Sequence, residues 1–161
     1  MTIAEYNQSV DEYADRLYRF VLKNLHDEES ARDIVQETYT KLWVKIQDVS
    51  AEKVRAYLFT AAYHTMIDMI RKEKRKSDFN EVNQEMYSHN EHYSDLSEIL
   101  HEAVKKLPDD QRSVILLRDY EGYSYNEIAE ITGLSESQVK VYIYRGRMFL
   151  KNYLGNVETL I

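Results

Sequence analysis

The residues with the clearest functional pattern in this chain lie near its C-terminal end, in the segment SYNEIAEITGLSESQVKVYIYRGR (124–147). The pattern predicts a short helix, a turn at Gly133 and a longer helix, because glycine accepts the left-handed backbone that ends a helix sharply. A helix-turn-helix of this kind presents the start of its second helix to the major groove of DNA. The side chains that we expect to read bases or neutralise phosphates there are Glu136, Ser137, Lys140, Val141, Tyr144, Arg145 and Arg147.

A helical hairpin with a solvated basic face is the ordinary alternative for any single match to this pattern. Two features favour DNA binding over that alternative. The match closes a helical domain, and each of its helices has its own capping signal, Ser124 with Glu127 and Ser135 with Gln138. We therefore predict that this segment binds DNA.

A second group of candidate residues lies in EKVRAYLFTAAYHTMIDMIRKEKRK (52–76), where aromatic and basic side chains alternate. Aromatic rings stack on single-stranded bases, and neighbouring cations hold the phosphate backbone. The residues that fit this role are Tyr57, Tyr63, His64, Arg71 and Lys74. Tyrosines at helical spacing belong to a hydrophobic core more often than to a base-binding face, so the pattern alone leaves both interpretations open.

The acidic charge of the chain is confined to one segment. Residues 77–110 hold nine acidic and two basic residues, which accounts for the whole net charge of −7. The chain on either side is neutral and contains local basic clusters, including RKEKRK (71–76). Because salt screens charges beyond about 8–10 Å, these local clusters decide what the surface contacts.

The apolar pattern predicts an all-α protein of two small helical bundles. Residues 1–76 carry apolar residues at steps of three and four over about 3–24, 28–46 and 51–75, which indicates three helices. Residues 77–94 have no apolar period and are predicted to be a flexible acidic linker. The pattern returns over 95–161, where Pro108, Gly122 and Gly133 divide a predicted four-helix domain.

Several classes of function are excluded by composition. The chain has no cysteine, no run of about 18 apolar residues, no Gly-rich phosphate loop and no HExxH motif. His89, His92 and His101 lie in or beside the acidic segment and are better explained as solvated side chains than as zinc ligands. We predict a cytoplasmic protein that is not an enzyme, binds no metal or cofactor and does not insert into a membrane.

Together with DIVQETYTKLW (33–43), these segments resemble one family closely, the bacterial sigma factors of the extracytoplasmic-function group (group 4 of the sigma-70 family). The resemblance covers nearly the whole chain. It implies that residues 1–76 correspond to sigma region 2, that residues 77–94 form the linker, and that residues 95–161 correspond to sigma region 4. The implied function is to bind RNA polymerase core and direct promoter-specific transcription initiation.

The resemblance also implies roles for individual residues. In the family, the polar face of the second helix docks on RNA polymerase core, and here that face holds Asp33, Gln36, Glu37, Thr40 and Lys41. Region 2 recognises and melts the minus-ten element, the role implied for the aromatic and basic residues of 52–76, and region 4 reads the minus-thirty-five element. This chain has His64 where similar proteins have an asparagine, and Tyr142 where many relatives carry an arginine.

The partners implied are RNA polymerase core, promoter DNA and, as is common in the family, an anti-sigma factor, either membrane-bound or soluble. A stand-alone helix-turn-helix transcriptional regulator is the alternative that the residues leave open. Such a regulator normally dimerises on a two-fold operator.

Overall fold

The computed structural model describes residues 1–79 and 96–160, and all regular structure in them is helical. Seven α-helices and one π-helical segment follow one another in these residues, without a strand. The predicted all-α fold with two small bundles is confirmed. The predicted linker lies outside the described residues from residue 80 onward, whereas residues 77–79 continue the third helix.

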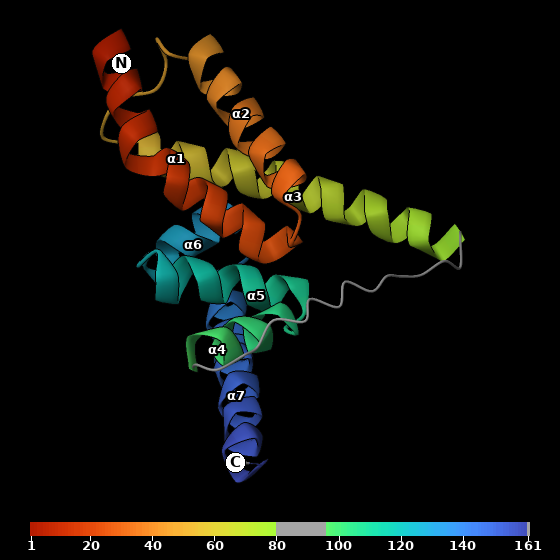
Figure 1. Cartoon of the computed structure of the whole chain (residues 1–161). Helices are drawn as coiled ribbons and strands as arrows, with labels where there is room; N and C mark the ends of the chain where they lie inside the picture. The colour runs from red at the N-terminus through yellow and green to blue at the C-terminus, as the bar shows by residue number, and fades with distance from the viewer. Residues whose placement is uncertain (80–95, 161) are drawn as a thin grey trace.

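The first bundle consists of α1 (Ile3–Leu25), α2 (Glu28–Val44) and α3 (Val54–Phe79), coloured red to yellow-green in Figure 1. Helix α3 begins at Val54 rather than at Ala51 as expected, because 51–53 form turns. The apolar stripes of the three helices meet in a core. Its largest fully buried side chains are Leu17, Phe20, Ile34, Leu42, Leu58, Phe59 and Met66.

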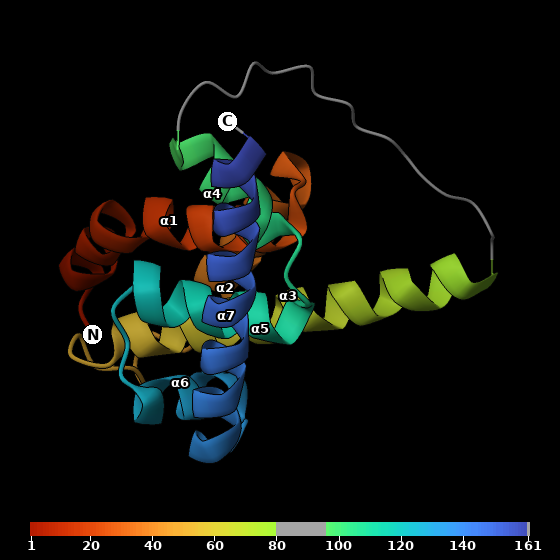
Figure 2. The same cartoon turned by 90° about the horizontal axis from the view of Figure 1, so that it is seen from below.

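The second bundle consists of α4 (Leu96–Lys105), α5 (Asp109–Ile115), the π-helical segment η1 (Leu116–Tyr120), α6 (Tyr125–Thr132) and α7 (Glu136–Leu160). Helix α7 is the longest of these and runs past α4, α5 and α6 (Figure 2). The core that they enclose includes Val114, Leu117, Ile128, Ile131, Val139 and Ile143.

Helices α5 and α7 approach each other closely at Gly146, a buried residue on α7. A Cβ atom at this position would lie 2.9 Å from Ile115 Cγ1, which is closer than real Cβ contacts allow. Gly146 is therefore required by packing. Gly155, further along the same helix, has no atom within 4 Å of such a Cβ.

The two bundles pack against each other and share one hydrophobic core (Figures 1 and 2). Helix α6 lies against α3, and α4 and α5 touch α1. The buried rings of Phe59 in α3 and Tyr123, just before α6, meet edge to face with centroids 5.5 Å apart. A buried hydrogen bond of 2.9 Å runs from Ser113 Oγ to Asn24 Oδ1. The sequence pattern predicted both bundles but not this contact between them.

The two helical glycines of α7 provide a test of this packing. Replacing Gly155 with Ala should raise stability by up to about 1 kcal/mol, because Ala is the better helix former. Replacing Gly146 with Ala should instead lower stability by about 1 kcal/mol, since the added methyl group overpacks the contact with Ile115. Thermal unfolding of the two variants beside the wild type measures both effects. Equal stabilisation by the two substitutions would contradict the close approach of α5 and α7.

Candidate nucleic-acid and polymerase interfaces

The helix-turn-helix predicted from the sequence is formed by α6 and α7. The Ser124 hydroxyl accepts a hydrogen bond from the Glu127 amide, and the Glu127 carboxylate accepts one from the Ser124 amide. Ser135 and Gln138 make the same pair of bonds at the start of α7. Between the helices, Gly133 has a left-handed backbone with φ of 81°. Both predicted capping boxes and the predicted glycine turn are confirmed.

The face of α7 that the sequence assigned to DNA is open to solvent. All seven predicted residues are exposed: Glu136, Ser137, Lys140, Val141, Tyr144, Arg145 and Arg147. Two of their cations are held by nearby acids. Arg147 Nη2 lies 2.6 Å from Asp119 Oδ1, and Lys140 Nζ lies 3.8 Å from Glu136 Oε1. The structure therefore brings these side chains together on one accessible surface.

Tyr142, noted above as a departure from the family, does not belong to that surface. It follows Val141 by about 100° around the helix, which turns it towards the first bundle. The side chain is partly buried and lines a groove facing α3. The sequence alone placed it in the recognition helix without showing which side it would occupy.

The five residues proposed for the minus-ten element divide between two faces of α3. Tyr57, His64 and Arg71 recur every seven residues and so share one side of the helix. His64 and Arg71 are exposed, and Tyr57 is half-buried. Tyr63 and Lys74 lie on the side that faces the second bundle, and Arg71, at the border of the two sides, also lines the groove there. Tyr63 is only 7% exposed, whereas the Lys74 side chain is 70% exposed. The structure thus does not gather all five on one open surface, because α3 uses one side for packing.

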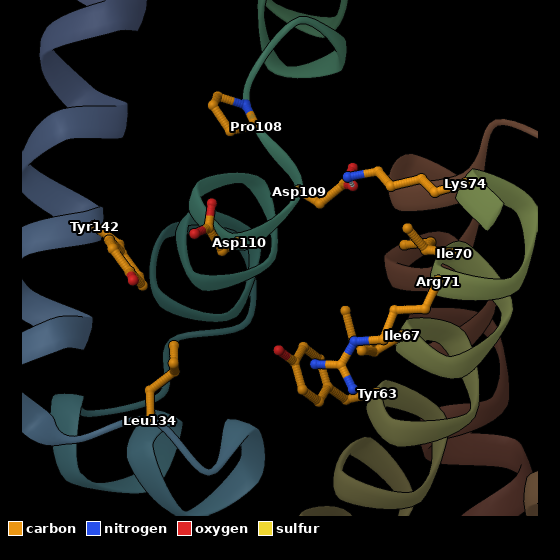
Figure 3. A pocket seen from close by; sticks show the side chains of 10 residues that line it. All are labelled: Tyr63, Ile67, Ile70, Arg71, Lys74, Pro108, Asp109, Asp110, Leu134 and Tyr142. Carbon is orange, nitrogen blue, oxygen red and sulfur yellow. Dashed lines mark ion pairs between the residues drawn. The ribbon is translucent and has the colours of Figure 1, made fainter. Parts of the chain in front are cut away.

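A groove of about 650 Å³ runs between α3 and the second bundle (Figure 3). Tyr63, Ile67 and Arg71 line one wall, and Asp110 and Tyr142 lie on the other. Burial raises the pKa of the Tyr63 hydroxyl, Arg71 opposes this shift and Asp110 adds to it. The phenol therefore stays neutral at physiological pH.

One ion pair crosses this groove. Lys74 Nζ of α3 lies 2.8 Å from Asp109 Oδ2 at the start of α5 (Figure 3). The other oxygen of Asp109 lies 2.8 Å from Nη1 of the buried Arg112. An acid of the second bundle therefore neutralises a cation that the sequence assigned to DNA.

Glu121 joins the bundles at the opposite end of the contact. Its carboxylate lies 3.2 Å from Nε of Arg16 in α1, and its carbonyl accepts a hydrogen bond from Arg55 of α3. The Arg55 guanidinium also lies 4.3 Å from the ring centroid of Tyr123. Burial, opposed by Arg55, raises the pKa of the Tyr123 hydroxyl well above its ordinary value. Sequence reasoning missed this cluster, because Glu121 lies 66 positions from Arg55 and 105 positions from Arg16 along the chain.

The predicted polymerase face on α2 is also exposed. Asp33, Gln36, Glu37, Thr40 and Lys41 all lie at the surface, and α2 packs mainly on α1 and α3. Lys41 pairs with Glu37 at 3.6 Å. Sequence reasoning missed the adjoining apolar surface at the end of α2, where Trp43 is 49% and Val44 is 77% exposed. Val44 follows Thr40 by four residues, so the same helical spacing could have identified it.

Within 1–79 and 96–160, no group of three or more His, Cys, Asp or Glu side chains is arranged to hold a metal ion. Of the predicted solvated histidines, His101 is exposed, while His89 and His92 lie outside those residues. No helix in this part of the chain combines the length and apolar character needed to cross a membrane.

Two family models match the chain. The model of sigma-70 region 2 matches residues 10–76, and that of sigma-70 region 4 matches residues 97–150. Two relatives from Bacillus subtilis (strain 168) are similar over most of their length. The RNA polymerase sigma factor YlaC is 32% identical over 150 residues, covering 87% of this chain and 86% of the relative. The ECF RNA polymerase sigma factor SigM is 30% identical over 156 residues, 94% of each chain.

Two solved structures are similar in fold. The sigma factor RpoE from Bartonella quintana, crystallised with the anti-sigma factor NepR, matches with a TM-score of 0.79 and 25% identity, covering 95% of this chain and 98% of that one. CnrH in complex with the cytosolic domain of CnrY matches with a TM-score of 0.66 and 23% identity, over 94% of this chain and 88% of that one.

The two capping boxes allow a pH test of the helix-turn-helix. Replacing Ser124 or Ser135 with Ala should each cost about 1 kcal/mol at neutral pH. Hydrogen bonds from Ser124 lower the pKa of Glu127, so this carboxylate adds stability above its unfolded pKa and loses it as pH falls through the folded value. The Glu127 carboxylate accepts from the backbone amide of Ser124, which Ser124→Ala would keep, so the pH dependence is tested at Glu127 itself. The cost of Glu127→Ala should shrink below about pH 4, whereas that of Gln138→Ala, which removes the equivalent neutral side chain, should not. Urea unfolding at several pH values measures both costs, and parallel pH curves would contradict the role of Glu127.

Proposed function

The chain belongs to the extracytoplasmic-function sigma factors of the sigma-70 family, and we propose that its two bundles divide the work of promoter recognition. It is a sigma factor that binds RNA polymerase core and promoter DNA and directs transcription initiation. The stand-alone regulator is not favoured. In the proposed division, residues 1–76 bind the polymerase and the minus-ten element, 77–94 link the domains, and 95–161 bind the minus-thirty-five element.

The open face of α7 is the observation that best supports this division of promoter contacts between the two bundles. Seven residues chosen from the sequence for contact with DNA are all exposed on one recognition helix, while Val139, Ile143 and Gly146 hold its other side. We assign no catalytic step to the protein, because melting a promoter requires binding energy alone and a flipped base costs only a few kcal/mol. The proposed place of action is the cytoplasm, where bacterial promoters and their polymerase are found.

The exposed polar face of α2 is the proposed docking surface for RNA polymerase core. Helix faces with polar side chains at three and four spacing bind partner helices or grooves through a few dominant contacts. Asp33, Gln36 and Glu37 occupy three successive positions of this spacing and are exposed. The apolar Val44 next to them would add buried area to the same contact.

Replacing Asp33, Gln36 and Glu37 together with Ala should weaken binding to RNA polymerase core about tenfold or more. A matched control exists on α1, where Gln8, Asp11 and Glu12 are exposed, have the same three residue types and repeat the same spacing. The control variant should bind like the wild type. Titration of core polymerase with each purified protein, followed by sedimentation, gives the affinities. Equal affinity of the two variants would contradict the assignment of α2.

We propose that the two bundles separate when the protein binds a promoter. The arrangement in which they are in contact is called the closed form. In this form Tyr63 is buried, and Lys74 is paired with Asp109 although its side chain remains 70% exposed, so the second bundle occupies part of the proposed minus-ten surface. The carboxylate of Asp109 holds Lys74 at a place where a DNA phosphate would bring the same negative charge, and Arg71 lines the same groove. DNA and the second bundle therefore compete for one surface.

The likeness to RpoE supports a regulatory role for the closed form. That protein was solved with an anti-sigma factor, and its chain matches both bundles of this one over 95% of the length. We propose that an anti-sigma factor binds this chain too and favours the closed form. By mass action, a partner that binds only one of two forms shifts the population towards it.

Opening can be measured by a distance between the bundles. The chain has no cysteine, so Asp11→Cys in α1 and Asn126→Cys in α6, both at exposed positions, allow clean spin labelling. The distance between the labels should increase when core polymerase and promoter DNA bind. A pair at Asp11 and Lys45, within the first bundle, should keep its distance. An unchanged distance between the bundles in the complex would contradict the proposed opening.

A further inference from the structure

The open face of α7 carries an apolar stripe among its basic residues. Val141 is 42%, Tyr144 is 65% and Met148 is 39% exposed, although each is large and hydrophobic. They follow one another at three and four residues, so they form one line along the helix. Lys140 and Arg145 border this line and are exposed as well.

The core does not explain why these side chains are apolar. The buried side of α7 is occupied by Val139, Ile143 and Gly146, which pack into the second bundle. Val141 and Tyr144 lie away from that side, where a solvated helix would carry polar residues. An exposed apolar line on a helix indicates a surface that is covered when a partner binds.

The charges beside the stripe identify DNA as that partner. Arg145 is exposed beside the stripe and has no acidic partner among the described residues. Lys140 lies 3.8 Å from Glu136 Oε1, and Asp119 holds the Arg147 guanidinium through contacts of 2.6 and 3.2 Å. Basic side chains along this face favour contact with a polyanion. Within the major groove, the apolar feature at the base edges is the C5-methyl group of thymine. A cationic helix with an apolar centre therefore fits a groove in which phosphates flank thymine methyl groups.

The spacing along the helix fits neighbouring base pairs. Three residues of α-helix advance about 4.5 Å, close to the step of about 3.4 Å between stacked bases. Val141 and Tyr144 can thus reach methyl groups on adjacent base pairs. Met148 lies about 10 Å beyond Val141 along the helix, about three base steps away, and so is left outside the contact with these two base pairs.

We propose that Val141 and Tyr144 recognise thymine methyl groups on adjacent base pairs of the minus-thirty-five element. The inference rests on the proposed binding of that element by α7 and specifies which bases it prefers. Lys140 and Arg145 then serve mainly to hold phosphates or guanines beside the methyl contacts. The hydroxyl of Tyr144 is not needed for the preference, because the ring supplies the apolar contact.

Exchange of thymine for uracil tests this proposal, since it removes only the methyl group. Holoenzyme assembled from bacterial RNA polymerase core and this chain would select sequences from DNA randomised across the minus-thirty-five element. Affinity would then be measured on the selected duplex and on copies with uracil at single thymine positions. Uracil should weaken binding about three- to fivefold at each of two adjacent positions and leave affinity unchanged at others.

Variants of the stripe assign each methyl group to a side chain. Val141→Ala should abolish the discrimination between thymine and uracil at one position, and Tyr144→Ala at the next. Tyr144→Phe should keep the discrimination because it retains the ring. Met148→Ala, at the third exposed apolar position, is the matched control and should retain both preferences.

The outcomes separate this proposal from the one on which it depends. Equal affinity for thymine and uracil, with Arg145→Ala still weakening promoter binding, would overturn methyl recognition while supporting the role of α7. In that case the stripe would belong to a protein contact. If Arg145→Ala leaves binding unchanged and no sequence is enriched, the assignment of α7 to the minus-thirty-five element fails, and methyl recognition fails with it.

Discussion

Helix α3 packs against the second bundle with one side and carries residues assigned to DNA on the adjoining surface. The rest of this structure depends on that constraint. One side of the helix supplies Phe59 to a core shared with Tyr123 of the second bundle, and Arg55 binds both the Tyr123 ring and the Glu121 carbonyl. The adjoining surface carries the aromatic and basic residues suited to single-stranded DNA. A helix cannot present Tyr63 to a base while the same side chain is 7% exposed in a contact between bundles. Packing and binding therefore exclude each other there.

The recognition helix is arranged differently, since its packing and binding sides are separate. Val139, Ile143 and Gly146 face the core, and the residues assigned to DNA face solvent in the same closed arrangement. In the closed form, the second bundle therefore exposes all of the residues assigned to DNA, whereas the first bundle does not. Under the proposed function, the exposed face of α7 can meet duplex DNA without separation of the bundles, whereas Lys74 must leave Asp109 before it can hold a phosphate.

Local signals in the sequence predicted much of the fold and part of the site. Capping boxes and a glycine turn concern residues within four positions of one another, so Ser124, Gly133 and Ser135 could be assigned correctly from sequence. Contacts across 66 to 105 positions, such as those of Glu121 with Arg55 and Arg16, leave no such signal. The division of α3 into two faces, and the turn of Tyr142 towards the groove, depend on these distant contacts.

The distribution of acids links the closed form to the charge pattern of the chain. Asp109 belongs to the segment 77–110 that carries the whole excess of negative charge, and its carboxylate is paired with Lys74. A free factor with unpaired cations on both bundles would bind any DNA, because phosphate contacts carry no sequence information. The pairing of Lys74 with Asp109 reduces the positive charge that the first bundle offers to such non-specific contact. In the proposed function, specific binding requires the polymerase to hold the bundles apart while each contacts its own promoter element.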